Sequence, residues 1–336
     1  MAVDVPASSS DADQRFDDTE VRVADRSPVA AEAAGVSRGA AQRGSVTRVV
    51  TPTISVRKRL HEIWLSRELL IYLVRTEIKV KYKNSVLGLV WSMVAPAMTL
   101  AIYFFVFSIL LDNKMPNFVI YLFAGLLLWN LFQLGVLTGT GVVVNNAGIV
   151  KKVSFPREIL ALAAVGSACV FFFFQSIVMV IFMVILRAPP DPAYFPLLIV
   201  ALIAGVILAS GLAVLLSSIN VYLRDTQHLI EVVLTAWFWA CPIVYSYQTV
   251  EAKLGPRHLT WLYLANPMTP LILAFQRCLY NKPSAVINGK LTLILPQHGY
   301  LWYAGLVGIV LVIGVVLFLV ALTVFGRLEG NFAEEL

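Results

Sequence analysis

The feature that most constrains this chain is a series of apolar segments, each long enough to cross a lipid bilayer. A helix needs about 20 mainly apolar residues to span the hydrocarbon core. The segments that qualify cover residues 86–111, 118–144, 159–186, 194–219, 227–246 and 300–326. Hydrophobic residues make up 59% of the chain and charged residues 14%, whereas soluble domains are about half apolar and a quarter charged. The sequence therefore predicts an all-α polytopic membrane protein with six transmembrane helices.

The two ends of the chain differ from this apolar body. Residues 1–55 are rich in Ala, Ser, Asp and Arg and nearly lack aromatic residues. Such a segment cannot bury enough apolar surface to offset its loss of conformational entropy, so we expect a disordered tail. It lacks the apolar core of a signal peptide. Residues 327–336 form a short segment after the last predicted span.

The distribution of Lys and Arg predicts the orientation in the membrane. Basic residues gather before the first span, in the loop after the second span and, as Arg224, in the loop after the fourth. The opposite short loops contain only Lys114 and Arg187. Because short cytoplasmic loops are enriched in Lys and Arg, we expect both termini to be cytoplasmic. The connection over 247–299 then faces outward, and the protein lies in the plasma (inner) membrane.

Residues 57–83 are too charged to span the bilayer but have an amphipathic pattern. At helical periodicity, Leu70, Ile71, Val74, Ile78 and Tyr82 share one face. The basic residues Arg75, Lys79 and Lys83 recur every four residues along its edge. We interpret the segment as a cytoplasmic interface helix with its apolar side in lipid. The simpler alternative is a basic anchor that only helps to set the topology.

The loop between the second and third spans is more structured than a simple connection requires. It reads NNAGIVKKVSFPRE over residues 145–158. Pro156 disfavours helical geometry in the residue before it and suits the start of the next helix, and Glu158 would then lie in that helix's first turn. These signals predict a short helix followed by a stiff corner. An apolar and basic protrusion of this kind fits a surface that a soluble partner grips.

No metal or catalytic site is indicated by the titratable residues. The three cysteines have no metal-ligand spacing, and the four histidines are far apart in the sequence. The predicted loops contain acidic residues singly, so paired-carboxylate or metal chemistry is not expected. The chain also has no G-x-x-x-x-G-K-[ST] phosphate loop, so any ATP-driven step must use another polypeptide.

Four stretches of the chain, in this order, resemble the permease subunits of type-2 ABC exporters for polysaccharides, which carry O-antigen, teichoic acid or galactan on lipid carriers. RTEIKVKYKNSVLGLVWSMVAPAMTLAIYFFVFS is similar to the interface helix and first span of that family. NNAGIVKKVSFPREILAL is similar to its coupling helix, and NVYLRDT to its second cytoplasmic loop. ANPMTPLILAFQRCLYN resembles the short outer re-entrant helices that precede the last span. The resemblance covers residues 57–336, with a looser fit at GNFAEEL.

The resemblance implies that two copies of this chain assemble with two cytoplasmic ABC ATPase subunits, which bind the ATP and Mg²⁺. The chain itself is then a transporter permease without a cofactor, and no nucleic acid is expected as a partner. Its coupling helix, over about 145–158, would transmit the movement of the ATPase. The coupling residues implied are Asn145, Asn146, Ile149, Lys151, Lys152, Phe155, Pro156, Arg157, Glu158, Arg224 and Asp225.

The family also implies a path for a polyprenyl-diphosphate-linked glycan. Arg75, Lys79 and Lys83 are the residues expected to contact the lipid diphosphate. Aromatic rings suit a glycan path, because they stack on sugar faces without fixed charge. The candidates are Trp91, Tyr103, Phe107, Trp237, Phe238, Trp239 and Tyr245. An outer gate is implied at Asn266, Pro267, Pro270 and Arg277. Each has a simpler alternative: membrane anchoring for the cations and lipid contact for the aromatic rings.

Two other functions remain open from the residues. A type-2 exporter for a drug or a small lipid would have the same fold, and a polyprenyl-dependent membrane glycosyltransferase is the enzymatic alternative. The aromatic spans favour polysaccharide, and the Ala-, Val- and Arg-rich tail weakly favours the cell-wall galactan of a high-GC bacterium.

Overall fold

The computed structural model describes residues 56–81, 83, 90–110, 115–153, 155–280, 282, 284–287 and 290–336. The tail predicted over residues 1–55 lies outside this set, as do Tyr82 and the beginning of the first predicted span.

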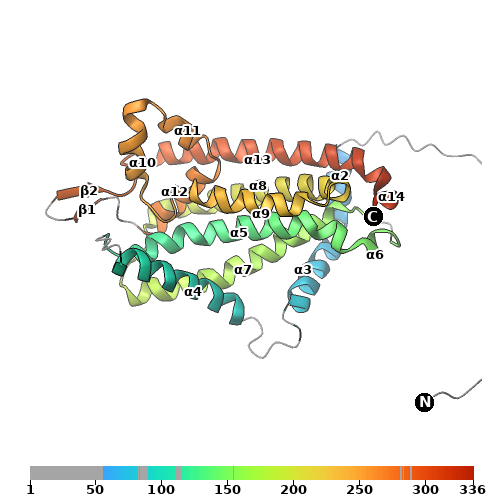
Figure 1. Cartoon of the computed structure of the whole chain (residues 1–336), viewed down its shortest axis with the longest axis horizontal. Helices are drawn as coiled ribbons and strands as arrows, with labels where there is room; N and C mark the ends of the chain where they lie inside the picture. Colours follow the sequence, from blue (N-terminus) through green and yellow to red (C-terminus); the bar gives the residue numbers. More distant parts are fainter. Residues whose placement is uncertain are drawn as a thin grey trace, which may run out of the picture. The chain divides into compact units, whose positions relative to one another are not determined.

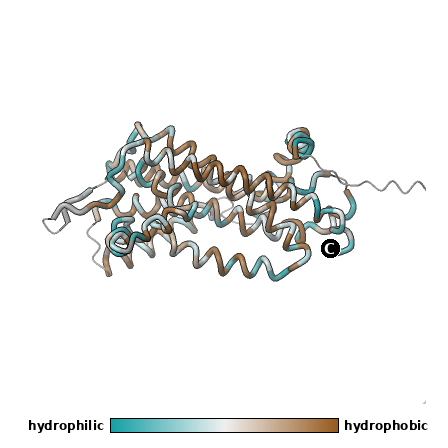
Figure 2. The backbone as a smooth tube through the Cα atoms, turned by 90° about the horizontal axis from the view of Figure 1, so that it is seen from above, coloured by the Kyte–Doolittle hydropathy of each residue, from teal (hydrophilic) through white to brown (hydrophobic). Residues whose placement is uncertain are grey.

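Long helices that run side by side form the bundle (Figure 1). Four of them are long and apolar enough to cross a membrane. They are α5 (Phe118–Asn145), α7 (Glu158–Ile185), α8 (Phe195–Tyr222, extended by the 3-10 turn Pro192–Tyr194) and α13 (Tyr300–Leu328). They confirm that the second, third, fourth and sixth predicted segments form long apolar helices. In Figure 2 these helices are brown through their middle and teal mainly near their ends, as expected for helices whose centres lie in hydrocarbon.

Shorter elements complete the bundle. Within the first and fifth predicted spans they are α4 (Trp91–Phe104), a π-helical turn Phe105–Leu110 and α9 (Thr226–Trp239). One end of the bundle is formed by α10 (Tyr247–Leu254), the 3-10 turn Gly255–Arg257, α11 (Thr260–Leu264), α12 (Met268–Leu279) and strands β1 (Ser284–Ile287) and β2 (Lys290–Leu293). We call this the hairpin end. At the opposite end, the turn end, lie α2 (Val56–Leu65), α6 (Ala147–Val150), the 3-10 turn Glu329–Asn331 and α14 (Phe332–Glu335).

Helix α5 is the centre of the bundle. In its most apolar window 83% of the residues are buried, against 28% for α13. It packs against both α7 and α8, and α13 packs on the other side of α8. The aromatic residues Tyr121, Phe123, Trp129 and Phe132 of α5 are almost completely buried. The centre of the bundle is therefore filled by side chains of this one helix.

Glycine allows a close helix contact between α8 and α13. A Cβ atom added to Gly211 would lie 3.1 Å from the backbone nitrogen of Phe318 and 3.2 Å from a side-chain carbon of Leu317. Gly314 of α13 faces Leu208 of α8 in the same way, because a Cβ atom added to Gly314 would lie 3.4 Å from the backbone nitrogen of Leu208. Small residues at such positions let membrane helices approach closely.

The fifth predicted span, 227–246, extends too far, because α9 ends at Trp239. Pro242 has no backbone N–H and disrupts a helix around it. The carbonyl of Pro242 accepts hydrogen bonds from the Gln276 side-chain amide at 2.7 Å and from the Tyr121 hydroxyl at 3.2 Å. The carbonyl of Ala240 accepts one from Asn266 at 3.2 Å. Side chains of α5 and of the segment at α12 thus replace the helical hydrogen bonds that the sequence pattern led us to expect.

The helical bundle also has one short β-hairpin, at the hairpin end, which the sequence analysis did not predict. Strands β1 and β2 pair antiparallel, from Ser284 opposite Leu293 to Ile287 opposite Lys290. The signal for this hairpin is present in the sequence as the dipeptide Asn288-Gly289 between two short apolar stretches. These two residues lie outside the described set.

The predicted interface helix, 57–83, is two helices. Helix α2 ends at Leu65 and α3 (Arg67–Lys81) begins after a turn at Ser66. Helix α3 packs against α7, where Val74 meets Gly166. The expected apolar face holds in part, since Leu70, Val74 and Ile78 are half-buried while Ile71 is 49% exposed.

A buried ion cluster joins α2 to α7 and to the C-terminal segment. The Arg59 guanidinium forms an ion pair with Glu158, the first residue of α7, and a second with Glu329 at 2.8 Å. Arg59 is 8% exposed and Glu158 1%. Gly326 leaves the space that Arg59 needs, because a Cβ atom there would lie 2.7 Å from the guanidinium. We call Arg59, Glu158 and Glu329 the ion cluster.

Replacing Gly211 by leucine should weaken the contact between α8 and α13. The added side chain meets backbone on the facing helix, which cannot move as a side chain can, so we expect a loss of about 1–3 kcal/mol. Gly308→Leu in α13 is the matched control, since a Cβ atom there has open space around it. Thermal unfolding of the full chain in detergent measures both. Equal losses for the two variants would contradict a specific close contact at Gly211.

Replacing Arg59 by glutamine should destabilise the turn end strongly. The change leaves Glu158 buried without its cation, and breaking such pairs typically costs about 3–5 kcal/mol. Lys58→Gln is the control, because Lys58 is an exposed neighbour on the same helix, with a surface pair to Glu62 at 3.9 Å. Adding Glu158→Gln to Arg59→Gln should restore part of the lost thermal stability. No recovery in the double variant would mean that the cost does not come from the unpaired carboxylate.

Candidate functional site: the polar turn between α5 and α7

The polar turn begins at a capped helix end. Helix α5 ends at Asn145, and the Asn146 side chain donates a hydrogen bond to the Val142 carbonyl at 2.8 Å, while the Asn146 backbone N–H donates to the same carbonyl at 3.1 Å. The predicted coupling helix over 145–158 is shorter than expected, because α6 has only four residues, Ala147–Val150. The reason is that α5 itself continues to Asn145, which leaves one helical turn before the chain reverses.

The turn has an exposed tip. Val150 is 1% exposed and anchors α6 against the bundle, whereas Ile149 is 46% and Val153 54% exposed. Lys151 and Lys152 between them are exposed as well. We call Ile149, Lys151, Lys152 and Val153 the tip. It combines an apolar and a basic surface on a short, anchored element, which matches the predicted protrusion.

Four other predicted coupling residues of this turn point inward. The Arg157 guanidinium donates to the backbone carbonyl of Glu329 at 3.0 Å and lies over the Phe332 ring, 6.0 Å from its centroid. Glu158 belongs to the ion cluster. Phe155 and Pro156 are half-buried and line a cavity of about 420 Å³ together with Arg59. The turn is therefore divided into an exposed tip and an internal base.

The C-terminal segment connects this base to the second loop. Arg224 and Asp225 are exposed between α8 and α9. Just before them, the Tyr222 hydroxyl donates to the Leu328 carbonyl at 2.8 Å, and the Tyr222 ring lies 6.1 Å from that of Phe332. Phe332 is completely buried. The sequence analysis missed Arg59, Glu329 and Phe332, although a lone Phe in the polar terminal segment GNFAEEL was the available signal.

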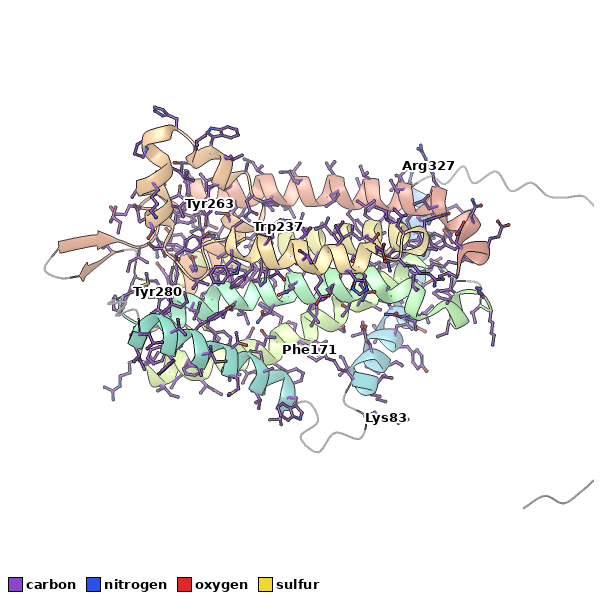
Figure 3. The ribbon with its side chains drawn as sticks, in the orientation of Figure 1. Lys83, Phe171, Trp237, Tyr263, Tyr280 and Arg327 are labelled. Atoms are coloured by element: carbon purple, nitrogen blue, oxygen red, sulfur yellow. The ribbon has the colours of Figure 1, made fainter. Side chains whose placement is uncertain are left out.

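The predicted lipid-diphosphate contacts do not face the bundle. Arg75, Lys79 and Lys83 are exposed, and Figure 3 labels Lys83 just beyond the end of α3. Lys81 is exposed as well, but its ammonium lies over the Phe171 ring of α7, and Glu77 is half-buried beside Ser167 of the same helix. Burial raises the pKa of the Glu77 carboxyl, against a hydrogen bond with the Ser167 side chain and the charge of Lys81. Burial lowers the pKa of the Lys81 ammonium, against the charge of Glu77.

Five of the seven predicted glycan-path aromatic residues form one cluster, and the other two lie apart from it. Trp237 packs against Phe132 of α5 at 5.3 Å between ring centroids (Figure 3), and Phe238 stacks with Tyr103 of α4 at 6.3 Å. Trp239 and Phe107 extend this cluster at either side, at 5.4 Å from Phe238 and 6.3 Å from Tyr103. Phe238 is 9% exposed, so within a single chain only Trp239, at 54%, offers a large free ring surface here.

Two predicted aromatic residues lie apart from this cluster. Trp91 lies at the beginning of α4 and is 49% exposed. The Tyr245 hydroxyl donates to the Trp239 carbonyl at 2.7 Å, so it stabilises the chain after α9.

The predicted outer-gate residues stabilise the hairpin end. The Asn266 side-chain oxygen accepts hydrogen bonds from the Trp237 indole at 2.8 Å and from the Met268 backbone at 3.1 Å. Pro267 caps the beginning of α12, and Pro270 is buried within its first turn. Arg277 pairs with Asp191 at 3.1 Å and lies 4.1 Å from the centroid of the Tyr194 ring, which connects α12 to the loop before α8.

Comparisons with known proteins fit this arrangement. Residues 68–280 match the family model described as ABC-2 type transporter. The chain is 26% identical over 269 residues to the O-antigen export system permease protein RfbA of Klebsiella pneumoniae, which covers 80% of this chain and 95% of that protein. It is 30% identical over 224 residues to the protein of the same name from Myxococcus xanthus, with coverage of 66% and 84%. Because the family model matches more than half of its length, the chain belongs to the ABC-2 type transporter family of membrane permeases.

Proposed function

We propose that this chain is the membrane subunit of an ATP-driven exporter that moves a lipid-linked polysaccharide across the plasma membrane. The observation that carries the proposal is the polar turn, whose tip is exposed and whose base is fixed by the ion cluster. A turn built in this way can pass a push on its tip directly to the ends of α5 and α7. The relatives are named as O-antigen export permeases, which favours a polysaccharide over a drug or a small lipid.

We further propose six spans with both termini in the cytoplasm. Helices α4 and α9 have 14 residues each and so rise about 21 Å, less than the hydrocarbon thickness. The π-helical turn after α4 and the side-chain-bonded segment after α9 would complete these two crossings. The tip lysines, Arg224 and the basic α2 all belong to the turn end, which supports a cytoplasmic location for that end.

The proposed assembly has two copies of this chain and two ABC ATPase subunits. The tip offers the ATPase an apolar contact at Ile149 flanked by cations at Lys151 and Lys152, and Arg224 and Asp225 offer a second contact from the loop after α8. ATP and Mg²⁺ would be held by the partner. The transported glycan would be carried on a polyprenyl diphosphate, and the composition of the tail favours a cell-wall galactan over O-antigen or teichoic acid.

The tip should be required for binding or coupling the ATPase. In a variant with Ile149→Glu, Lys151→Glu and Lys152→Glu, we expect the amount of ATPase subunit that co-purifies with the full chain to fall at least tenfold. The reason is that these changes invert the charge of the tip and remove its apolar contact. Lys253→Glu in α10, an exposed lysine near the hairpin end, is the control. Co-purification is measured in detergent, and export of lipid-linked glycan is measured in cells.

Unchanged ATPase recovery and export in the triple variant would contradict the role of the tip. Loss of polysaccharide export in a strain without this chain, restored by the wild type, separates the proposed cargo from the alternatives. Normal glycan export without the chain would instead favour a drug or small-lipid exporter.

A further inference from the structure

A groove lies along the side of the bundle where α3 and α4 meet α5 and α7. It consists of two adjoining cavities, of about 610 Å³ and 480 Å³, which share Lys81, Leu134 and Phe171 as lining residues. Phe171, labelled in Figure 3, lies on α7 where α3 and α4 diverge. We call this feature the lateral groove, the larger part its upper cavity and the smaller part its lower cavity.

The upper cavity has an unusual number of amide side chains for the middle of apolar helices. Asn130 donates to the Gln175 side-chain oxygen at 3.1 Å, and the Gln133 oxygen accepts from the Trp129 indole at 3.0 Å. Each amide has two donors and an oxygen with two lone pairs, so these bonds leave hydrogen-bonding capacity that faces the cavity. A polar group inside a membrane segment is costly unless it finds a partner. The arrangement favours an occupant rich in hydrogen-bonding oxygens.

One cation lies beside these amides. Among the described residues that line the upper cavity, only Lys81 is charged. Its ammonium lies 4.5 Å from the centroid of the Phe171 ring. Glu77, one turn earlier on α3, lines the lower cavity only and has the Ser167 side chain as a further partner. The charge offered to an occupant of the upper cavity is therefore positive.

The helices that form the groove also have exposed apolar side chains. Val80 of α3 is 67% exposed, Met98 and Ile102 of α4 are 58% and 56% exposed, and Ile177 of α7 is 50% exposed. In a membrane permease such side chains can contact hydrocarbon tails, whereas a free anion would gain nothing from them. An amphiphile with an anionic, oxygen-rich head fits both the cavity and its edges.

We propose that the lateral groove binds a lipid whose headgroup contains a phosphate, with the phosphate at Lys81 and the neighbouring head oxygens at Asn130, Gln133 and Gln175. Two sources share this chemistry, an anionic membrane phospholipid and the phosphorylated polyprenyl carrier of the exported glycan. Only the second source rests on the proposed function. Because Asn145, Asn146 and Ile149 line the lower cavity, a bound lipid lies next to the same helix end that bears the tip.

Native mass spectrometry of the purified full-length permease, with its ATPase where it co-purifies, tests this site. The probes are phosphatidylglycerol, polyprenyl phosphate and, as a lipid without phosphate, diacylglycerol. We expect Lys81→Gln to lower the occupancy of at least one phosphate lipid about tenfold, the effect of losing one charged hydrogen bond of about 1.4 kcal/mol. Lys253→Gln, which changes an exposed lysine of α10 that lines neither cavity, should leave occupancy unchanged.

Two further variants separate binding from folding. Lys81→Arg keeps the charge and should retain most of the binding. Gln175→Leu removes one amide and should lower binding while Lys81 remains. Equal losses in the Lys253 and Lys81 variants, or equal retention of diacylglycerol and the phosphate lipids, would overturn the proposal.

The preferred lipid identifies the source. Preference for polyprenyl phosphate assigns the groove to the exported cargo, and preference for phosphatidylglycerol assigns it to the membrane; both support a phosphate-lipid site. The result is independent of the tip, since a permease that fails to recover an ATPase can still bind the lipid through Lys81.

Discussion

The turn end depends on one buried guanidinium. Arg59 holds together three parts of the chain that are far apart in sequence, since it pairs with Glu158 at the beginning of α7 and with Glu329 after α13. Two carboxylates so close to each other would repel without it. Arg157 and Phe332 add a second connection between the same elements. These contacts fix the base of the polar turn, while its tip stays accessible.

The bundle could be predicted well from the sequence where a helix satisfies its own backbone. The ranges of α5, α7, α8 and α13 follow from apolar length alone, because nothing in those segments interrupts the hydrogen-bond ladder. The prediction was wrong where this condition fails. Hydropathy stays high through residues 240–246, yet Pro242 ends the helix there and the freed carbonyls find partners on Tyr121 and Gln276. Such tertiary partners cannot be read from a local pattern.

The candidate site shows the same limit at the level of single residues. The exposed tip and its basic residues followed from the sequence, because exposure and charge are local properties. The inward direction of Arg157 and Glu158 did not, since it depends on a C-terminal segment that begins 172 residues after Arg157. Likewise, the periodicity of α3 predicted an amphipathic helix, but only its packing on α7 determines that Lys81, and not Lys79, lines the lateral groove. The functional roles of these residues stay predictions.

The hydrogen bonds around residues 240–246 have a consequence for how the protein is made. A membrane helix that satisfies its own backbone can enter the bilayer as soon as it is synthesised. The segment after α9 cannot be completed in this way, because Asn266 and Gln276, which supply donors to its carbonyls, are translated later. Its insertion must therefore finish only after α12 has emerged from the ribosome.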